Sequence, residues 1–446
     1  MSDLCSGGPV RRPAGDPAPY ERGAADLATG RRTLLQLGGA GLAMSAATAG
    51  LGMEHAEAVS PRTRKRAYVF VIDGCKPEEI DAGLTPHLMR LRDRGMRWSR
   101  ASSMPIMETI PNHVMMMTGV RPDRSGVPAN SIYDRSIRDT RTLDRARDLG
   151  ADTILQRLNR QGLRTATVLS KEYLYGIFGP RAKRRWEPFP IIPVSGHAPD
   201  EFTMRAATAM VEDYDPHLMF VNLGDIDRYG HTDLTGPTGV RALRNLALAK
   251  TDNYIAQFTR MLVETGRWKN SMMIVLADHS MDWSYPHRVV SLQGPMDSDP
   301  FLAGKVAIGD NGGADLLYWL GPAAQREKAV RRMQRVAARV DGVHAALPRT
   351  KKWMRLGPEA GDVVVFCKKG WRFSDPDPVT SNPIPGNHGH LVTRSIPFFI
   401  TGGHRSVQRG VASADVAHTV DVAPTVADFF GVKGSPRGGW DGRSRL

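Results

Sequence analysis

The chain has 446 residues, of which 41% are hydrophobic and 24% are charged, a composition typical of a folded protein and not of wholesale disorder. Lysine and arginine total 60 against 46 acidic residues, a net charge of +14. This excess favours anionic partners such as phosphate esters, nucleic acid or acidic polymers, without choosing among them. The three cysteines, Cys5, Cys75 and Cys367, exclude a disulfide scaffold and a cysteine-rich structural zinc site.

The N-terminal 58 residues are predicted to be an export signal. The pair Arg31-Arg32 precedes a weakly apolar, glycine-rich run over residues 37–53, and Ala56-Glu57-Ala58 offers a small-residue cleavage site. Paired arginines before such a run resemble a twin-arginine signal. The run is too short for a stable membrane span, which needs about 20 strongly apolar residues. We therefore expect the twin-arginine machinery to export the protein to the periplasm, the cell wall or the medium. Cys75 and Cys367 would remain after cleavage, and their pairing is left open.

Short apolar runs alternate with amphipathic segments along the rest of the chain. This alternation predicts an α/β fold with a mostly parallel central sheet and helices on both faces. The expected strands cover residues 67–72, 165–169, 218–223, 271–277 and 396–401, and the expected helices cover residues 85–95, 109–119, 152–162, 200–214, 238–266 and 420–431.

Two stretches interrupt this alternation. Residues 284–385 are rich in glycine, proline and aspartate, with one helix expected over 322–340 and a weak strand over 362–367. We predict that they form a small cap subdomain inserted into a main domain that comprises residues 67–283 and 386–446. Residues 177–199 are rich in proline and arginine and are predicted to be a loop near the substrate.

Aspartates follow three of the predicted strands, and histidines accompany two of them. Asp73, Asp227 and Asp278 follow the first, third and fourth strands, with His231 and His279 close behind. Because the carboxyl ends of strands meet at one crevice of an open α/β sheet, these side chains are candidates for one site. Carboxylates gathered there would repel one another unless a divalent cation neutralised them. The mixture of carboxylate and imidazole indicates Zn²⁺ or a neighbouring transition metal, since Ca²⁺ and Mg²⁺ prefer oxygen ligands.

A further histidine ligand is expected from the segment Gly386-Asn387-His388-Gly389-His390. Its glycines permit a tight backbone turn, so that a distant loop can supply an imidazole to the site. On the residues alone, His388 and His390 are both candidates.

Thr109 is the candidate nucleophile. It stands where the N-cap of a helix is expected, with Pro111 in the first turn and Gly119 at the end. One interpretation is that Thr109 only caps the helix. In the other, the free N–H groups and partial positive charge of the helix N-terminus favour a threonine alkoxide and a bound phosphate, and a metal on that oxygen would lower its pKa.

Five motifs in order resemble those of the nucleotide pyrophosphatase/phosphodiesterase family, in the alkaline phosphatase superfamily. The resemblance spans about residues 67–431 and implies an alkaline phosphatase-like fold. The motifs are Asp73-Gly, Thr109-Ile-Pro-Asn-His with a downstream Thr-Gly-x-x-Pro-Asp-Arg-x-Gly, Asp227-x-x-Gly-His231, Ala277-Asp278-His279 and Gly386-Asn-His388-Gly.

The resemblance also implies two zinc ions and a reaction. One ion would be held by Asp227, His231 and His388, which favours His388 over His390; the other would be held by Asp73, Asp278, His279 and the hydroxyl of Thr109. Asn130 would donate to a phosphate oxygen. Thr109 would attack phosphorus and expel an alcohol or phosphate, and water would then hydrolyse the phosphothreonine ester. The expected protein is thus a type I phosphodiesterase acting on a small phosphate ester or nucleotide, with no specific nucleic-acid binding.

Departures from the family pattern leave alternatives open. The sequence Asp73-Gly-Cys-Lys-Pro-Glu resembles the start of phosphonoacetate hydrolases, which cleave a carbon–phosphorus bond, and Ser280 replaces the usual glycine after Asp-His. A phosphomonoesterase on the same metals would need basic groups, although these equally fit a solvated loop. The candidates for them are Lys171, Arg181, Lys183 and Arg184. The alternative from another class is an exported, non-catalytic binder of polyanions.

Overall fold

The computed structural model describes residues 64–189, 196–233, 239–376, 385–432 and 434–446. The predicted export signal, residues 1–58, lies outside the described residues. Within the described part of the chain, no helix has both the length and the apolar character needed to cross a membrane. Cys75 and Cys367 are both buried and both free.

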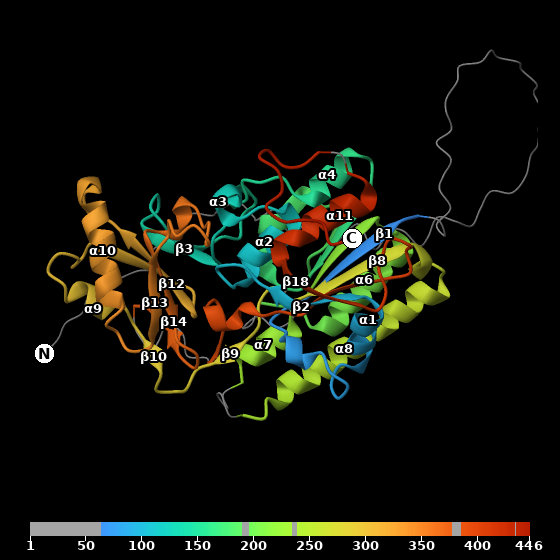
Figure 1. Ribbon diagram of the computed structural model, residues 1–446, viewed down its shortest axis with the longest axis horizontal. Coiled ribbons are helices and arrows are strands. Elements are labelled where there is room, and N and C mark those ends of the chain that lie inside the picture. Colours follow the sequence, from blue (N-terminus) through green and yellow to red (C-terminus); the bar gives the residue numbers. More distant parts are fainter. Residues whose placement is uncertain (1–63, 190–195, 234–238, 377–384, 433) are drawn as a thin grey trace, which may run out of the picture. The chain divides into compact units, whose positions relative to one another are not determined.

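A mixed, mostly parallel sheet forms the centre of the fold (Figure 1). It has eight strands in the order β18-β2-β17-β8-β1-β7-β5-β6. Only β17 runs antiparallel to its neighbours, β2 and β8. The predicted fold class is therefore confirmed. The strands are β1 (Arg66–Ile72), β2 (Met96–Ser102), β5 (Thr165–Leu169), β6 (Arg184–Trp186), β7 (Leu218–Leu223), β8 (Ser271–Leu276), β17 (Phe398–Thr401) and β18 (Val411–His418).

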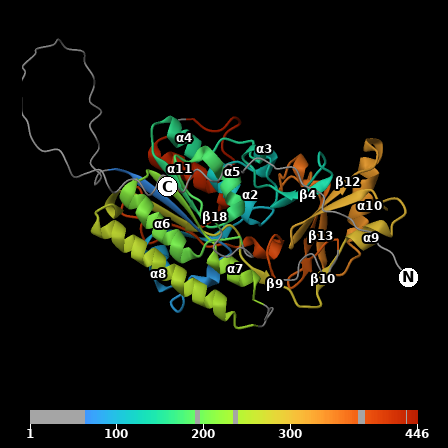
Figure 2. The ribbon, with the colours of Figure 1, turned by 180° about the vertical axis from the view of Figure 1, so that it is seen from behind.

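Helices cover both faces of this sheet (Figures 1 and 2). On one face α1 (Pro86–Arg94) and α6 (Asp200–Asp213) pack against the long α8 (Ala242–Glu264). On the other face α2 (Thr109–Thr118), α4 (Ile154–Arg160) and α11 (Val422–Phe430) pack together. The strands β1, β7 and β8 are buried along their whole length, as expected for parallel strands covered on both faces.

The chain between β9 (Asp282–Trp283) and β16 (Gly386–Asn387), which pair with each other, builds a second sheet with its own core. This antiparallel sheet has the order β11-β12-β14-β13. The helix α10 (Arg326–Ala337) buries its apolar side in a core that also contains Trp319. The strands are β11 (Val306–Asp310), β12 (Ala314–Trp319), β13 (Val343–Pro348) and β14 (Val363–Cys367), and two smaller elements are α9 (Gln293–Asp297) and the pair β10 (Val289–Val290) with β15 (Arg372–Phe373).

Three strands of the central sheet and one hairpin are not predicted by the sequence. In β2 only Trp98 and Ala101 are buried, and most of β18 is partly or fully exposed, so neither has the continuous apolar run of a central strand. The stretch 177–199 was expected to be a loop, but it contains the short edge strand β6. The hairpin of β3 (Ser131–Asp134) and β4 (Asp139–Thr142) is likewise mostly polar. Edge and surface strands lack the burial that makes a strand visible in sequence.

Replacing Phe258 with alanine is expected to lower the free energy of unfolding by about 3–5 kcal/mol. Phe258 lies on α8 and contacts Tyr68 and Phe70 of β1 edge-on, with ring centroids 5.4 and 5.2 Å apart. Truncation leaves a cavity between helix and sheet. Urea unfolding measures the change, and Leu243→Ala on the same helix is the control, since Leu243 is 57% exposed and its loss should change stability by less than about 0.5 kcal/mol. Equal effects of the two changes would contradict this packing.

Candidate active site

The sheet brings the predicted aspartates together because their strands are neighbours. Asp73 follows β1, Asp278 follows β8, and Asp227 lies in the first turn of α7 (Asp225–His231), directly after β7. The strands β8, β1 and β7 are adjacent and parallel, so their carboxyl ends open onto one place. All three carboxylates are buried.

All seven predicted metal ligands lie in this place. Two groups have ligand atoms within 4.8 Å of one another: Asp227, His279 and His388, and Asp73, Asp278 and His279. The ring of His388 stacks on that of His279 with centroids 3.7 Å apart. The remaining ligands are His231, whose Nε2 is 3.3 Å from Asp227 Oδ1, and Thr109, whose Oγ1 is 3.2 Å from His279 Nε2.

The hydrogen bonds of the histidines fix which nitrogen faces the cluster. His231 Nδ1 is 2.8 Å from the carbonyl oxygen of Gly386, and His279 Nδ1 is 3.0 Å from that of Ser280. A carbonyl oxygen can only accept, so each Nδ1 carries a proton, and in a neutral ring Nε2 is the nitrogen with the lone pair. The Nε2 atoms face carboxylate oxygens, at 3.3 Å in Asp227 and 3.4 Å in Asp278. A contact of this length between a nitrogen and a carboxylate needs a positive charge between them, either a proton or a metal ion.

Each carboxylate of the cluster uses one oxygen within the protein and leaves the other unpaired. Asp278 Oδ1 accepts from the N–H groups of Gly74 and His279, at 3.2 and 3.0 Å. Asp73 Oδ2 accepts from Asn222 at 3.0 Å. By contrast, Asp73 Oδ1, Asp227 Oδ1 and Asp278 Oδ2 are buried without a hydrogen-bond partner among the described residues. Unpaired buried oxygens are costly, and their position beside imidazole nitrogens fits divalent cations that take mixed oxygen and nitrogen ligands.

Burial shifts the pKa values of the cluster so that the side chains favour their neutral forms, with Asp227 as the exception. Burial lowers the pKa of His279 to about 4 and that of His388 well below its usual range, so both rings are neutral, as metal ligands must be. Burial, followed by the neighbouring Asp278, raises the pKa of Asp73, and burial raises that of Asp278 to about 6. Burial opposes ionisation of Asp227 as well, but Lys171 and the nearby histidines hold its pKa well below the usual range.

Lys171 is one of four basic residues for which the sequence leaves two interpretations open, a group beside the substrate or a solvated loop. Its side chain is fully buried, so the solvated loop does not apply to this residue. Its Nζ lies 2.7 Å from Asp227 Oδ2 and 2.8 Å from Asp73 Oδ2. Lys171 follows β5, the neighbour of β7, so the rule that located the aspartates would also have located it. Lys183 and Arg184 are exposed, and Arg181 binds backbone carbonyls instead.

Thr109 opens α2 and is fully buried. The sequence placed it at the N-cap, but the N-cap is Glu108, whose backbone is extended, and Thr109 is already the first helical residue. Its hydroxyl therefore does not cap the helix and is free to face His279. Glu108 does not cap the helix through its side chain either; it accepts the N–H of Asn130 at 2.7 Å.

Asn130 is held at the start of the same helix. Its Oδ1 accepts the N–H of Ile110 at 2.8 Å, one of the first-turn donors that have no partner inside a helix. With the oxygen fixed in this way, the side-chain NH₂ group is left as the donor that Asn130 can offer to a ligand beside Thr109.

The structure separates the two histidines that the residues alone leave open and of which the family resemblance favours His388. His388 stacks on His279 within the cluster, whereas His390 Nε2 binds Asp282 at 3.1 Å. The turn before β12 packs closely against this segment. A Cβ on Gly313 would lie only 2.1 Å from the carbonyl oxygen of His388, so the turn needs glycine there. Asn311 of the same turn binds the backbone of Ser131, beside Asn130, at 2.8 and 3.0 Å.

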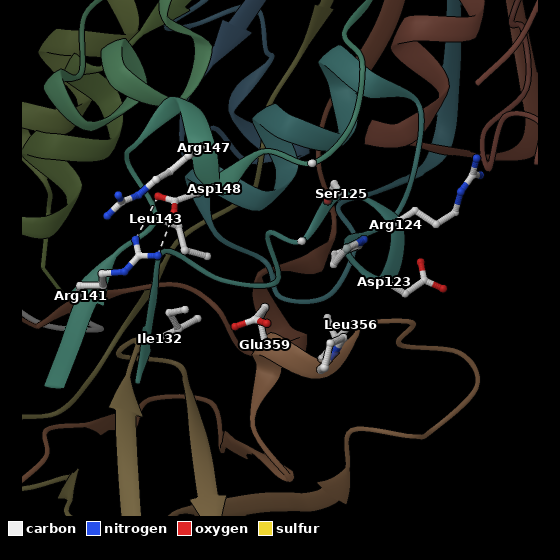
Figure 3. Close-up of a pocket in the computed structure, with 14 residues that line it drawn as sticks. Asp123, Arg124, Ser125, Ile132, Arg141, Leu143, Arg147, Asp148, Leu356 and Glu359 are labelled. Atoms are coloured by element: carbon white, nitrogen blue, oxygen red, sulfur yellow. Dashed lines mark hydrogen bonds and ion pairs between the residues drawn. The ribbon is translucent and has the colours of Figure 1, made fainter. Parts of the chain in front are cut away.

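A separate cavity of about 410 Å³ lies near the β3–β4 hairpin (Figure 3). Ile132, Leu143 and the ion pair of Arg141 with Asp148, 2.8 Å long, line it together with Glu359. None of the clustered aspartates and histidines lines this cavity, so it is not the place where their chemistry is gathered.

The fold is of the α/β class. Together with the cluster of acidic, imidazole and threonine side chains, it defines the protein as a hydrolase. The family described as type I phosphodiesterase/nucleotide pyrophosphatase matches residues 67–391. The chain belongs to this family.

Known relatives agree with this assignment. The chain is 21% identical over 398 residues to the bovine bis(5'-adenosyl)-triphosphatase ENPP4. The matched region covers 84% of this chain and 80% of the bovine protein. It is 23% identical over 227 residues to human ectonucleotide pyrophosphatase/phosphodiesterase family member 1, covering 48% of this chain and 23% of that protein.

Solved structures share the fold. Murine ENPP5, an inactive threonine-to-alanine variant in complex with AMP, superimposes with a TM-score of 0.67 at 16% identity, covering 83% of this chain and 96% of that one. Phosphonoacetate hydrolase from Sinorhizobium meliloti 1021, in complex with phosphonoformate, gives a TM-score of 0.61 at 21% identity, covering 83% and 95%.

Replacing Asp200 with asparagine is expected to stabilise the protein by an amount that grows as the pH rises from 5 to 8. Asp200 accepts the N–H of Asp225, which opens α7, and the hydroxyl of Thr251. Burial, followed by the neighbouring Asp225, raises its pKa. A raised pKa means that the folded state keeps a proton which the unfolded state has lost, so stability falls as the pH rises above about 4.

The measurement is urea unfolding of both proteins between pH 5 and pH 8, where asparagine should gain on the order of 1–3 kcal/mol at the upper end. Asp213→Asn, at the exposed end of the same helix α6, is the control and should follow the wild type. A difference between wild type and Asp200→Asn that stays constant with pH would contradict the assignment.

Proposed function

We propose that this protein is a two-zinc phosphodiesterase that hydrolyses nucleotides or similar small phosphate esters through a phosphothreonine formed on Thr109. One observation carries the proposal. Three buried carboxylate oxygens, on Asp73, Asp227 and Asp278, have no hydrogen-bond partner in the described part of the chain and face imidazole nitrogens beside the Thr109 hydroxyl.

The residues divide naturally between two ions. Asp73, Asp278, His279 and Thr109 Oγ1 would hold one, and Asp227, His231 and His388 would hold the other. When bound, zinc acts as a Lewis acid, lowers the pKa of a coordinated hydroxyl and neutralises charge on phosphate oxygens. The donor set of aspartates and neutral histidines suits zinc and neighbouring transition metals.

Thr109 supplies the nucleophile, and its place in the first turn of α2 supports an oxyanion there. In the first step Thr109 Oγ1 gives up its proton to water and forms a bond to phosphorus, while the bond from phosphorus to the leaving oxygen breaks. The leaving oxygen takes up a proton from water, and the group departs as an alcohol or phosphate. In the second step a water molecule gives up a proton as its oxygen bonds to phosphorus, the bond from Thr109 Oγ1 to phosphorus breaks, and Oγ1 takes up a proton. The NH₂ group of Asn130 donates to a non-bridging phosphate oxygen in both steps.

The relatives support a nucleotide substrate. The bovine relative is named for its action on a bis(5'-adenosyl) triphosphate, and the murine structure holds AMP. Export by the twin-arginine machinery, based on residues 1–58, stays a prediction.

Lys171 favours a second candidate, the hydrolysis of phosphonates or phosphate monoesters. These substrates carry one more negative charge than a diester, and a buried ammonium group within 3 Å of Asp73 and Asp227 places positive charge at the cluster. The pairing of Lys171 with two carboxylates offsets much of that charge, so the diester remains the first candidate.

Thr109→Ala is expected to reduce hydrolysis of bis-p-nitrophenyl phosphate by a factor of about 10³ or more, because the covalent step needs the threonine oxygen. The assay panel contains bis-p-nitrophenyl phosphate, p-nitrophenyl thymidine monophosphate, p-nitrophenyl phosphate and phosphonoacetate, with added zinc. The first two should be the better substrates of the wild type. Faster turnover of p-nitrophenyl phosphate or phosphonoacetate would favour the second candidate.

Zinc content serves as the control for this variant. Wild-type protein should purify with about two zinc ions per chain, and Thr109→Ala should keep most of them, since aspartates and histidines supply the other ligands. Near-normal turnover by the variant would refute Thr109 as the nucleophile. A wild type without zinc and without hydrolysis would instead point to a non-catalytic binder of polyanions.

A further inference from the structure

The guanidinium of Arg244 connects the two loops that carry the clustered carboxylates. Arg244 lies in the first turn of α8 and is fully buried. Its Nη2 donates to the carbonyl oxygen of Gly74 at 2.8 Å, and its Nη1 donates to that of Ile226 at 2.7 Å. Gly74 directly follows Asp73, and Ile226 directly precedes Asp227.

The sheet alone does not fix the distance between these loops. Backbone pairing of β1 with β7 ends at Ile72 and Leu223, with one further bond from the Asp73 N–H to the Leu223 carbonyl oxygen at 3.1 Å. Beyond this point the chain leaves the ladder on both sides. The bonds from Arg244 connect the two loops beyond the end of the sheet. They join Gly74, the residue after Asp73, to Ile226, the residue before Asp227.

Glu79 holds the guanidinium in place. Its two carboxylate oxygens accept from Arg244 Nε at 2.8 Å and from Nη2 at 2.7 Å. Glu79 also accepts the N–H of Lys76 at 2.7 Å, so the loop after Asp73 closes on itself and on Arg244. A planar fork with a bidentate carboxylate partner has little freedom to move.

The same guanidinium packs against the segment that ends in His231. A Cβ on Gly230 would lie 2.8 Å from Arg244 Nη1, so only glycine allows this approach. The Gly230 carbonyl oxygen accepts from Trp283 Nε1 at 3.0 Å, and the Trp283 ring centre is 5.4 Å from the guanidinium. Arg244 therefore contacts residues adjacent in sequence to Asp73, Asp227 and His231, which belong to both proposed ions.

We propose that Arg244 is a positioning residue that sets the spacing of the two metal sites by tying the Gly74 and Ile226 carbonyls to one guanidinium. This inference rests on the proposed function, since it concerns the same two sites. Lysine cannot replace it, because one ammonium group does not reach two carbonyls and a bidentate carboxylate in fixed directions. Groups that orient metal ligands from behind typically change metal affinity or activity by 10–100-fold when they are altered.

Arg66 provides a matched control. It is also fully buried and also forms a bidentate pair, with Asp215 at 2.7 Å to each oxygen. It stands at the opposite end of β1 from Asp73. Arg66→Lys therefore breaks a comparable buried ion pair without touching the loops of the cluster.

The experiment compares the full-length zinc-loaded wild type with Arg244→Lys and Arg66→Lys. Three quantities are measured: the melting temperature, zinc affinity by competition with a chromophoric chelator, and kcat and KM for bis-p-nitrophenyl phosphate. Both variants should melt lower than the wild type. Only Arg244→Lys should lose zinc affinity, by about 10–100-fold, and it should lower kcat more than it changes KM. Arg66→Lys should bind zinc as the wild type does.

Two outcomes overturn the inference. In the first, the zinc affinity and kcat of Arg244→Lys match those of the wild type. In the second, both variants lose zinc affinity equally, which would show only a general loss of stability.

If Arg244→Lys does not fold, Glu79→Gln replaces it. This variant keeps Arg244 and its carbonyl bonds but loosens their anchor, so a loss of zinc affinity of up to about tenfold is expected, and an unchanged affinity overturns the inference. A wild type that binds no zinc refutes the proposed function itself, whereas an unchanged Arg244→Lys in a zinc-binding background refutes only the role of Arg244.

Discussion

Burying three carboxylates at the carboxyl ends of three adjacent parallel strands is the constraint on which the rest of the structure depends. Asp73, Asp227 and Asp278 are almost completely removed from water, where ionised groups are stable only when they are compensated. The chain compensates one oxygen of each with backbone N–H groups, Asn222 or Lys171. It leaves the other oxygens facing imidazole nitrogens. The described part of the protein therefore provides hydrogen bonds to only one oxygen of each carboxylate. In a structural ion-pair network both oxygens would be paired within the protein, so the open oxygens indicate a binding site.

The chain between β9 and β16 belongs to the support of this site. The β9–β16 pair holds the segment that leads to His388, and the Gly386 carbonyl fixes the ring of His231. The turn at Gly313 and Asn311 approaches both the His388 backbone and the strand that follows Asn130. This later stretch of the chain thus helps to hold His231 and His388, which belong to one of the two proposed ligand sets, and the segment that follows Asn130.

Burial explains which elements the sequence could predict. The runs of β1, β7 and β8 are apolar throughout because both faces are covered, so they are visible without any knowledge of the fold. The strands β2, β6 and β18 carry arginines, serines or other polar residues because they lie at or near the edges of the sheet. Lys171 was left undecided for the opposite reason: a basic residue in a basic stretch fits solvent as well as a site, and only its two aspartate partners explain its burial.

The sequence by itself determined the fold class and the identity of the clustered residues, because buried strands and the polar residues that follow them leave a pattern in consecutive positions. The residues alone left His388 and His390 open, and only the family resemblance favoured His388. Nothing in the sequence places the helix boundary at Glu108. Nor does the sequence show that Lys171, Asn222 and Arg244 contact the clustered residues and their loops. Those facts depend on contacts between residues that are about 50 to 170 positions apart, such as Lys171 with Asp227 and Arg244 with Gly74. Only the packed tertiary structure decides such contacts, because side-chain direction and burial are properties of neighbours in space.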